Sequence, residues 1–176
     1  FMWGVEVLGW EVFMLASTLD PERFRELFLD AAFTKSLEAI EMLSSLDSPF
    51  VFVHDDLANA KGPVFSPNWY NANIFPKYCE LLAPVKKVGK KVSFVGDGNM
   101  AKFIQRLKET CVDGVMVENP ATDFDLIVKE FGDKIIIGGI ETSILTFGTS
   151  AEIKKHVNEV HQKVKGIPGF AMSTPG

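Results

Sequence analysis

The protein has 176 residues, of which 47% are hydrophobic and 23% are charged, and its formal net charge is −5. This length and composition are those of an ordinary soluble domain that buries its own core. The acidic balance gives no electrostatic reason to expect a nucleic acid or an anionic membrane as partner, and no apolar run approaches the roughly 18 residues that span a bilayer.

Helical patterns recur along the chain. Asp20-Pro21 predicts a helix that begins there and runs to about Leu46, because Pro suits the first helical position. The further helices predicted are one from Ser66-Pro67 to about Gly89 with a break at Pro76 or Pro84, one over 99–110, one from a Thr122-x-x-Asp125 capping box to Gly132, and one that begins at a Thr149-x-x-Glu152 capping box. On that last helix, an apolar stripe predicts the buried face, and His156 and His161 are expected in solvent.

Five short apolar runs lie between these helices and predict strands, at 49–54, 91–95, 114–117, 135–137 and 169–172. Their residues are apolar throughout instead of alternating, which indicates burial on both faces, as in parallel sheets. Strands joined by helices suit either an open doubly wound sheet or part of a (β/α)8 TIM-type barrel. No dinucleotide-binding fingerprint is present in the sequence.

Polar residues follow every predicted strand. They are His54-Asp55-Asp56, Asp97-Gly98-Asn99, Glu118-Asn119, Glu141-Thr142 and Ser173-Thr174. Any strand-end loop tends to be polar, since its backbone needs water and its helix needs a cap. Five such groups at one edge of a parallel sheet nevertheless favour a functional site there. We expect Asp55, Asp56 and Asp97 to act as acid, base or substrate-orienting groups, and His54, Asn99, Glu118, Asn119, Glu141 and Ser173 to bind substrate.

Strand alternation divides the first of these groups. His54 should share a face with Phe52, and Asp55 with Val53, so the three residues at 54–56 cannot all point the same way unless the chain turns. The acids Asp55, Asp56, Asp97 and Glu118 are oxygen ligands of the kind that magnesium, manganese or calcium prefers. No spacing indicates a metal site, and we expect neither a metal nor a cofactor.

Several motifs together resemble the uroporphyrinogen decarboxylase superfamily. They are Asp55-Asp56 followed by Gly62-Pro63-Val64-Phe65-Ser66-Pro67, Gly-Asp-Gly-Asn at 96–99, Gly138-Gly139-Ile140-Glu141, Phe147-Gly148-Thr149-x-x-Glu152, and Gly169-Phe170-Ala171-Met172-Ser173. The order holds from about residue 50 to the end. The resemblance implies a (β/α)8 barrel, of which this chain carries about five βα units as a single C-terminal portion. Residue 1 is Phe, and we expect earlier strands upstream.

The resemblance implies an enzyme, and three functions follow. The first is a decarboxylase (a lyase) acting on a tetrapyrrole or related small molecule without a cofactor. The second is a methyltransferase that works with a corrinoid protein, a branch that holds zinc through His-x-Cys-Gly-Asn. This chain has Val95 and Asp97 at the His and Cys positions, so that zinc site is not expected. The third is a catalytically degenerate binding subunit.

The sequence also gives expectations for the charge of the substrate, the cellular compartment and the binding partners. Uroporphyrinogen carries eight carboxylates by its chemistry, whereas Arg23, Arg25 and Arg106 all lie in helical patterns, so the acidic rim suits a neutral or cationic substrate better. Cys79 and Cys111 form no CxxC motif and are expected to be reduced thiols, which favours the cytoplasm. Expected partners are a small-molecule substrate and either a second copy or the missing N-terminal half, but no nucleic acid and no membrane.

Overall fold

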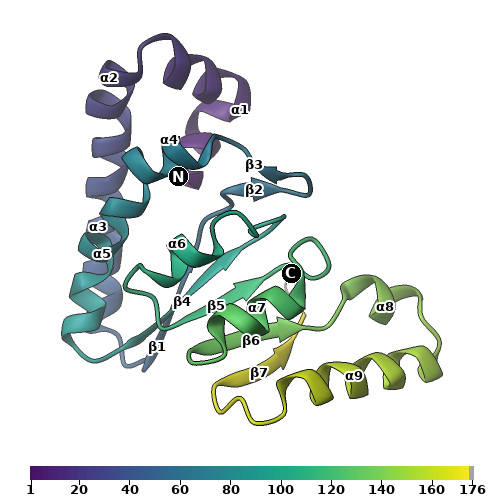
Figure 1. Ribbon diagram of the computed structural model, residues 1–176. Coiled ribbons are helices and arrows are strands. Elements are labelled where there is room, and N and C mark those ends of the chain that lie inside the picture. Colours follow the sequence, from purple (N-terminus) through teal and green to yellow (C-terminus); the bar gives the residue numbers. More distant parts are fainter. Residues whose placement is uncertain (175–176) are drawn as a thin grey trace. The chain divides into compact units, whose positions relative to one another are not determined.

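A computed structural model describes residues 1–174 (Figure 1). The chain divides into two compact units. The first comprises Phe1–Val51 and Phe65–Val92, and the second comprises Phe52–Val64 and the chain from Ser93 onward. The single domain expected from the sequence stays a prediction.

The first unit is helical. Its elements are α1 (Met2–Leu19), α2 (Pro21–Phe24), the π-helical turn η1 (Arg25–Leu29), α3 (Asp30–Ser45), α4 (Pro67–Asn73) and α5 (Phe75–Lys87). The Asp20 carboxylate accepts the N–H of Arg23 at 3.1 Å, which confirms the predicted helix start. The predicted break falls at Ile74, because Pro76 has no N–H for the helical ladder and its ring clashes with the preceding turn.

Aromatic packing forms the core of this unit. Val5, Phe13, Phe24 and Leu29 are buried together, and the rings of Phe13 and Phe24 meet edge to face at 5.1 Å between centroids. Edge-to-face contact of this kind adds to the hydrophobic gain from burying the rings. Packing between elements, including that of α3 against α5, therefore stabilises the unit.

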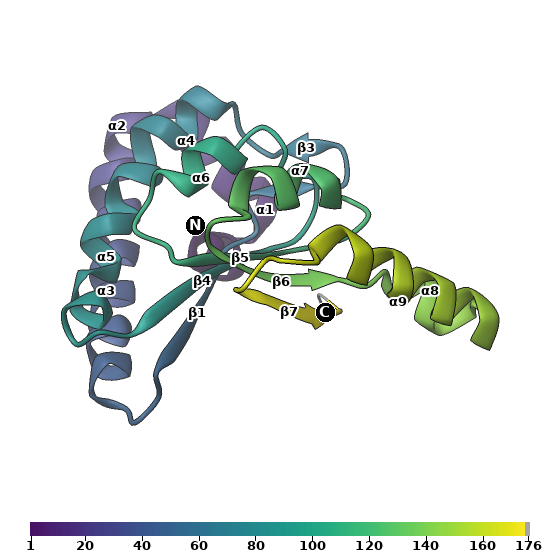
Figure 2. The same ribbon diagram turned by 60° about the horizontal axis from the view of Figure 1, so that its bottom comes forward.

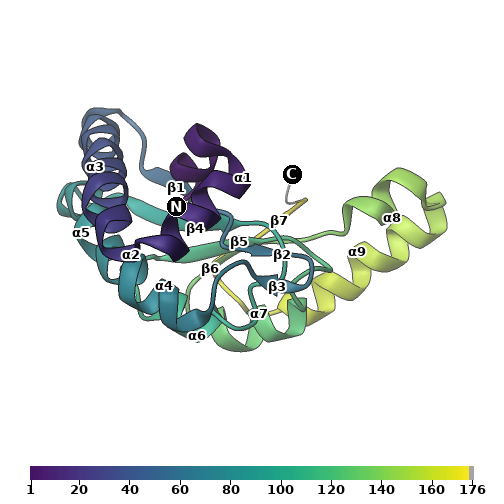
Figure 3. The same cartoon turned by 90° about the horizontal axis from the view of Figure 1, so that it is seen from above.

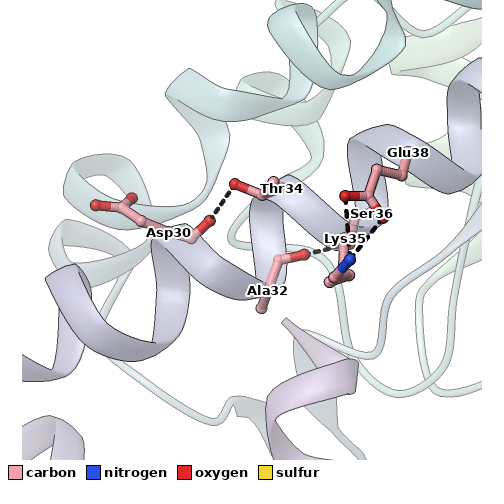
Figure 4. Close-up of polar contacts among 6 residues, drawn as sticks. All are labelled: Asp30, Ala32, Thr34, Lys35, Ser36 and Glu38. Atoms are coloured by element: carbon pink, nitrogen blue, oxygen red, sulfur yellow. Dashed lines mark hydrogen bonds and ion pairs between the residues drawn. The ribbon is translucent and has the colours of Figure 1, made fainter.

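Several side chains of α3 make contacts within the helix itself (Figure 4). Thr34 and Ser36 each donate a hydroxyl hydrogen bond of 2.9 Å to the carbonyl four residues earlier, and Lys35 pairs with Glu38 at 2.7 Å. Pairs of this type on a solvated helix are worth only tenths of a kcal/mol. They matter less to α3 than its packing against α5.

A five-stranded sheet organises the rest of the chain. Its strands are β1 (Phe50–His54), β4 (Lys91–Gly96), β5 (Gly114–Val117), β6 (Ile135–Gly139) and β7 (Phe170–Ser173), and they are neighbours in that order. Pairing is parallel from β4 through β7. A strand order that follows the chain order is that of a (β/α) barrel segment, whereas a doubly wound sheet reverses its order at a switch point.

Helices of the second unit cover one face of the sheet. They are α6 (Ile104–Lys108), α7 (Phe124–Phe131) and α9 (Ser150–Val164), while the short helix α8 (Thr142–Phe147) packs beside α9. Figures 2 and 3 show α6, α7 and α9 on the same side of the strands, and α7 contacts β6, α6 and α9. A short antiparallel hairpin, β2 (Ala58–Asn59) and β3 (Gly62–Pro63), follows β1. A parallel sheet with its helices on one side is the arrangement within a TIM-type barrel, as the sequence predicted.

The two faces of the sheet differ in burial. Phe94, Val115 and Ile136 occupy one register line and are almost completely buried. Their neighbours on the next line, Val95 and Met116, are only half-buried. Strand alternation sends these two lines to opposite faces. One face therefore packs against helices, and the other is the more open face.

Tertiary contacts overturn two of the predicted helix boundaries. Thr122 does not cap α7; the cap is Asp123, whose carboxylate accepts the N–H of Asp125 at 3.0 Å. The helix predicted over 99–110 shortens to α6, since the N–H groups of Asn99 and Met100 donate to other loops. The Thr149–Glu152 capping box is confirmed in both of its hydrogen bonds.

Both cysteines are disulfide-bonded in this structure. The expectation of reduced thiols is therefore wrong here, and it no longer supports a reducing compartment; the cytoplasmic location stays a prediction. Among residues 1–174, none of the helices has both the length and the apolarity needed to cross a membrane.

Thr122 generates the first prediction. Its hydroxyl is fully buried, donates to the carbonyl of Gly98 and accepts from the N–H of Met100, both at 2.8 Å. Thr122→Val keeps the shape but leaves both backbone groups unpaired, so it should lower the free energy of unfolding by about 1–3 kcal/mol. Thr34→Val on the exposed face of α3 is the control, expected within about 0.5 kcal/mol of wild type. Equal effects in denaturant titrations would contradict the buried role of Thr122.

Candidate functional site

The turn after β4 is held in place by hydrogen bonds that its backbone N–H groups donate to neighbouring segments. Four consecutive N–H groups, those of Asp97, Gly98, Asn99 and Met100, donate respectively to Asp56 Oδ1 (2.9 Å), Glu118 Oε2 (2.9 Å), the Asn59 carbonyl (2.9 Å) and Thr122 Oγ1 (2.8 Å). Two of these acceptors follow β1 and two follow β5. The turn is therefore tied to the strand on either side of it.

Gly98 allows this turn to approach the β2–β3 hairpin. Its φ is +76°, a conformation that side chains disfavour, and a Cβ there would lie 2.7 Å from the carbonyl oxygen of Ala58. The glycine in the segment 96–99 therefore lets the backbone of this turn pack closely against the backbone of the hairpin. Because its N–H groups already have protein acceptors, it is not a nest for a phosphate or another anion.

Three side chains converge beside this turn. His54 Nε2 lies 3.0 Å from Asp56 Oδ1, and one ligand-type atom from each of His54, Asp56 and Asp97 lies within 4.8 Å of the others. The side chains of His54 and Asp56 are 57% and 26% exposed, so solvent or a substrate can reach them. One imidazole and two carboxylates are a ligand set that could hold manganese, iron or zinc.

Within this group, Asp97 is the residue whose pKa is shifted. Partial desolvation raises the pKa of Asp97 above its ordinary value although the residue stays accessible, and the negative charges of Asp56 and Glu118 raise it further, while His54 acts in the opposite direction. Glu118 is fixed nearby because its carboxylate accepts the N–H of Gly98. A carboxyl group surrounded by like charges holds its proton to higher pH and is suited to acid–base work.

Asp55 lies apart from this group, as alternation predicted. It is only 5% exposed, whereas Asp56 and His54 are accessible. Its N–H donates to the carbonyl of Val95 at 2.9 Å, which continues the pairing of β1 with β4. The predicted catalytic role of Asp55 stays a prediction.

Two predicted substrate-binding residues make local contacts. The side-chain oxygen of Asn99 accepts the N–H of Ala101 at 3.1 Å, within the turn itself. Ser173 Oγ donates to the carbonyl of Thr174 at 3.0 Å, and the Ser173 carbonyl accepts the N–H of Ile140. Both are half-buried at the strand-end rim, and their substrate-binding roles stay predictions.

The remaining predicted residues, Asn119 and Glu141, belong to a second polar group. Together with His156 they line a cavity of about 400 Å³ beside α7 and α9. Asn119 Nδ2 donates to the carbonyl of Gly139 at 3.1 Å, and the Glu141 N–H donates to His156 Nε2 at 3.1 Å. Alternation explains the separation, since Asn119 follows Glu118 and points to the opposite face of the sheet.

The family follows from comparison with known proteins. The family model described as Uroporphyrinogen decarboxylase (URO-D) matches residues 5–174. The chain belongs to the uroporphyrinogen decarboxylase family. A comparison with curated proteins found no match. The resemblance in the motifs between residues 50 and 173 is thereby confirmed, and the match extends through α1 and α3 as well.

Within this family, the turn after β4 is the position at which the methyltransferase branch was expected to carry zinc ligands. The chain has Val95 and Asp97 there, and the structure shows Val95 half-buried in β4 and Asp97 exposed at the strand end. The ligand-type atoms that do converge come from His54, Asp56 and Asp97. This ligand set shares with the His-x-Cys motif only the Asp97 position, and its other two members come from the end of β1.

Two residues of the site region escaped the sequence analysis. Thr122 was read as a helix cap, yet it joins the β4 and β5 loops through Gly98 and Met100. His156 was expected in solvent and is in fact 9% exposed. Its position one turn before Val160, which is also buried, was the available signal, because residues four apart share a helix face.

Asp97 generates the second prediction. Its pKa is raised in the folded protein, so ionising it costs more there than in the unfolded chain, where an aspartate titrates near about 3.9. Asp97→Asn should therefore be more stable than wild type at neutral pH, by no more than about 1 kcal/mol because the group is solvated. This advantage should shrink as the pH falls through the folded pKa and vanish below about 3.9.

Asp133→Asn is the matched control of opposite sign. A side-chain hydrogen bond from Lys108 lowers the pKa of Asp133, so its carboxylate stabilises the folded state above the unfolded pKa and that contribution is lost on acidification. Asp133→Asn should thus be less stable than wild type at neutral pH. Unfolding curves across this pH range measure both effects. If both variants changed in the same direction, the assigned charge environment of Asp97 would be wrong.

Proposed function

We propose that this chain carries the acid–base site of a decarboxylase-type enzyme that acts on a small carboxylic acid at the ends of β1 and β4. Membership of the uroporphyrinogen decarboxylase family supports a decarboxylase or a related enzyme. The observation that carries the proposal is the convergence of His54, Asp56 and Asp97, with the pKa of Asp97 raised.

Decarboxylation suits a protonated Asp97. When the bond between the substrate carbon and its carboxylate breaks, CO2 leaves and the electron pair stays on the carbon, which then takes up a proton. A carboxyl group whose pKa is raised keeps a larger protonated fraction and can supply that proton, and water returns it afterwards. The net change is R–COO⁻ plus H⁺ to R–H plus CO2, with no cofactor.

Asp56 and His54 would position this acid. Asp56 Oδ1 accepts the N–H of Asp97 at 2.9 Å and lies 3.0 Å from His54 Nε2. One carboxylate oxygen thus fixes the backbone that carries Asp97 and also contacts the imidazole. The His54 side chain is more than half exposed, so it is available to contact substrate. Asn99 and Ser173 at the rim and Asn119 and Glu141 at the second cavity are proposed as further substrate contacts.

Electrostatics narrows the substrate class. The accessible side of the site carries Asp56, Asp97 and Glu118, all acidic. The three arginines lie in α2, η1 and α6, and Arg106 is paired with Glu109 at 2.8 Å. A polyanion such as a tetrapyrrole with many carboxylates would be repelled by this group. We therefore propose a substrate whose main negative charge is the carboxylate that leaves as CO2, and whose other groups are neutral or cationic.

Methyl transfer from a corrinoid protein is the second candidate. It is supported by the His54, Asp56 and Asp97 ligand set, which could hold a divalent metal of the kind that activates a methyl acceptor. A binding subunit without turnover is the third candidate, and it is the one that predicts no effect of these residues on chemistry.

The third prediction concerns turnover by the full-length protein. Asp97→Asn should lower the rate of CO2 release by about 10²–10⁴-fold, the usual contribution of a general acid, with a smaller effect on KM. Asp133→Asn is the control, since Asp133 pairs with Lys108 before the start of β6, at the opposite end of the strand from the site, and its variant should keep at least most of the wild-type rate. The measurement is CO2 release from a panel of small carboxylic acids of graded charge.

The alternatives give different results in the same experiment. Methylcobalamin turnover that depends on His54 and Asp56, without CO2 release, would select the methyltransferase. Unchanged turnover after replacement of Asp56 and Asp97 together would remove the acid–base assignment altogether. Binding of ligands without any turnover in wild type would select the binding subunit.

A further inference from the structure

His156 is a buried imidazole that the proposed chemistry does not use. It lies on α9 with 9% of its surface exposed, and its Nε2 accepts the backbone N–H of Glu141 at 3.1 Å. Glu141 stands at the junction of β6 and α8, as the residue that precedes the first turn of α8. One side chain of the last helix therefore holds the start of α8.

The helix α8 is short and packs only against α9 among the described elements with several contacts. It has six residues, none of which is buried, and Phe147 at its end is 86% exposed. Figure 1 shows α8 beside α9 at the edge of the second unit, away from the strands. A helix of this length has no independent stability, so its position depends on the contacts at its ends. The bond from Glu141 to His156 is one such contact.

This bond exists in only one protonation state of His156. A nitrogen that accepts a hydrogen bond carries no proton, so the neutral ring bears its hydrogen on Nδ1. A protonated imidazole has two donors and no acceptor, and its Nε2–H would face the Glu141 N–H across 3.1 Å. Among side chains, histidine is the one that ordinarily changes charge between about pH 5 and pH 8.

The surroundings can receive a protonated ring. His156 borders two cavities, of about 400 and 460 Å³. The ionisable groups that line them are Asp123 before α7, Glu141 before α8, and Glu152, Lys155, Glu159 and Lys163 on α9. Lys163 is paired with Asp125 of α7 at 2.7 Å, and Lys155 lies 3.8 Å from Glu159. Acidic groups therefore outnumber cations, and a protonated ring has carboxylates to turn toward.

We propose that His156 is a pH-sensitive latch: neutral, it holds the β6–α8 junction through the N–H of Glu141, and protonated, it releases that junction. The latch goes beyond the proposed decarboxylation and does not depend on it. Its consequence is that α8, and the Glu141 side of the 400 Å³ cavity, loosen as the pH falls.

Hydrogen exchange of the full-length protein tests the latch. Protection of the peptide that spans the β6–α8 junction, corrected for intrinsic exchange, should fall about tenfold between about pH 7.5 and about pH 5.5 in wild type, the effect of losing one hydrogen bond. His156→Gln offers an acceptor at every pH, so the same peptide should lose this pH response. His161→Gln, on the exposed side of α9, should respond as wild type.

Several outcomes would overturn the latch. One is equal protection of the junction in wild type at both pH values, and another is an undiminished response in His156→Gln. A fall of similar size in the α7 peptide would indicate general loosening instead of release at one junction. His156→Phe, which cannot accept, should show low protection at both pH values; if it does not fold, the wild-type and Gln comparison still decides. Activity is not a readout here, so the result is independent of the proposed reaction.

Discussion

The turn after β4 is the constraint on which the site depends. Four successive N–H groups at 97–100 each donate to an acceptor from the loops that follow β1 or β5. Buried or half-buried backbone donors need partners, and here the partners come from neighbouring strands instead of a helix. The arrangement fixes Asp97 beside Asp56 and Glu118. The same arrangement raises the pKa of Asp97, because burial and the two carboxylates both disfavour its charge.

Strand alternation distributes the polar residues of the rim into two groups. His54, Asp56 and Asp97 converge on one side of the turn, and the charge of Glu118 acts on Asp97 there. Asn119 and Glu141 line a cavity with residues of α7 and α9. Because successive side chains of a strand point to opposite faces, neighbours in sequence such as Glu118 and Asn119 belong to different polar groups. The ends of the parallel strands thus carry two separate groups of polar residues.

Membership of the uroporphyrinogen decarboxylase family suggests a decarboxylase or a related enzyme. The fold alone does not select the reaction, since one barrel supports many chemistries through its loops. The accessible group of this chain is acidic: the chain lacks a His-x-Cys zinc motif after β4, and its charges disfavour a polyanion. These features favour acid–base chemistry on a substrate of low negative charge.

Local patterns in the sequence determined much of the framework. Asp20-Pro21, Ser66-Pro67 and the Thr149–Glu152 capping box begin helices as predicted, because capping involves only residues within one turn. The five strands and the alternation that separates Asp55 from His54 were likewise readable, since apolar runs and a two-residue period are local properties. The tertiary structure alone decided the role of Thr122, which had the spacing of a cap but bonds Gly98 and Met100, and the hydrogen bond that His156 accepts from Glu141. In both cases the deciding partner lies fifteen or more residues away, and no pattern within a single helix specifies which distant backbone group a hydroxyl or an imidazole will meet.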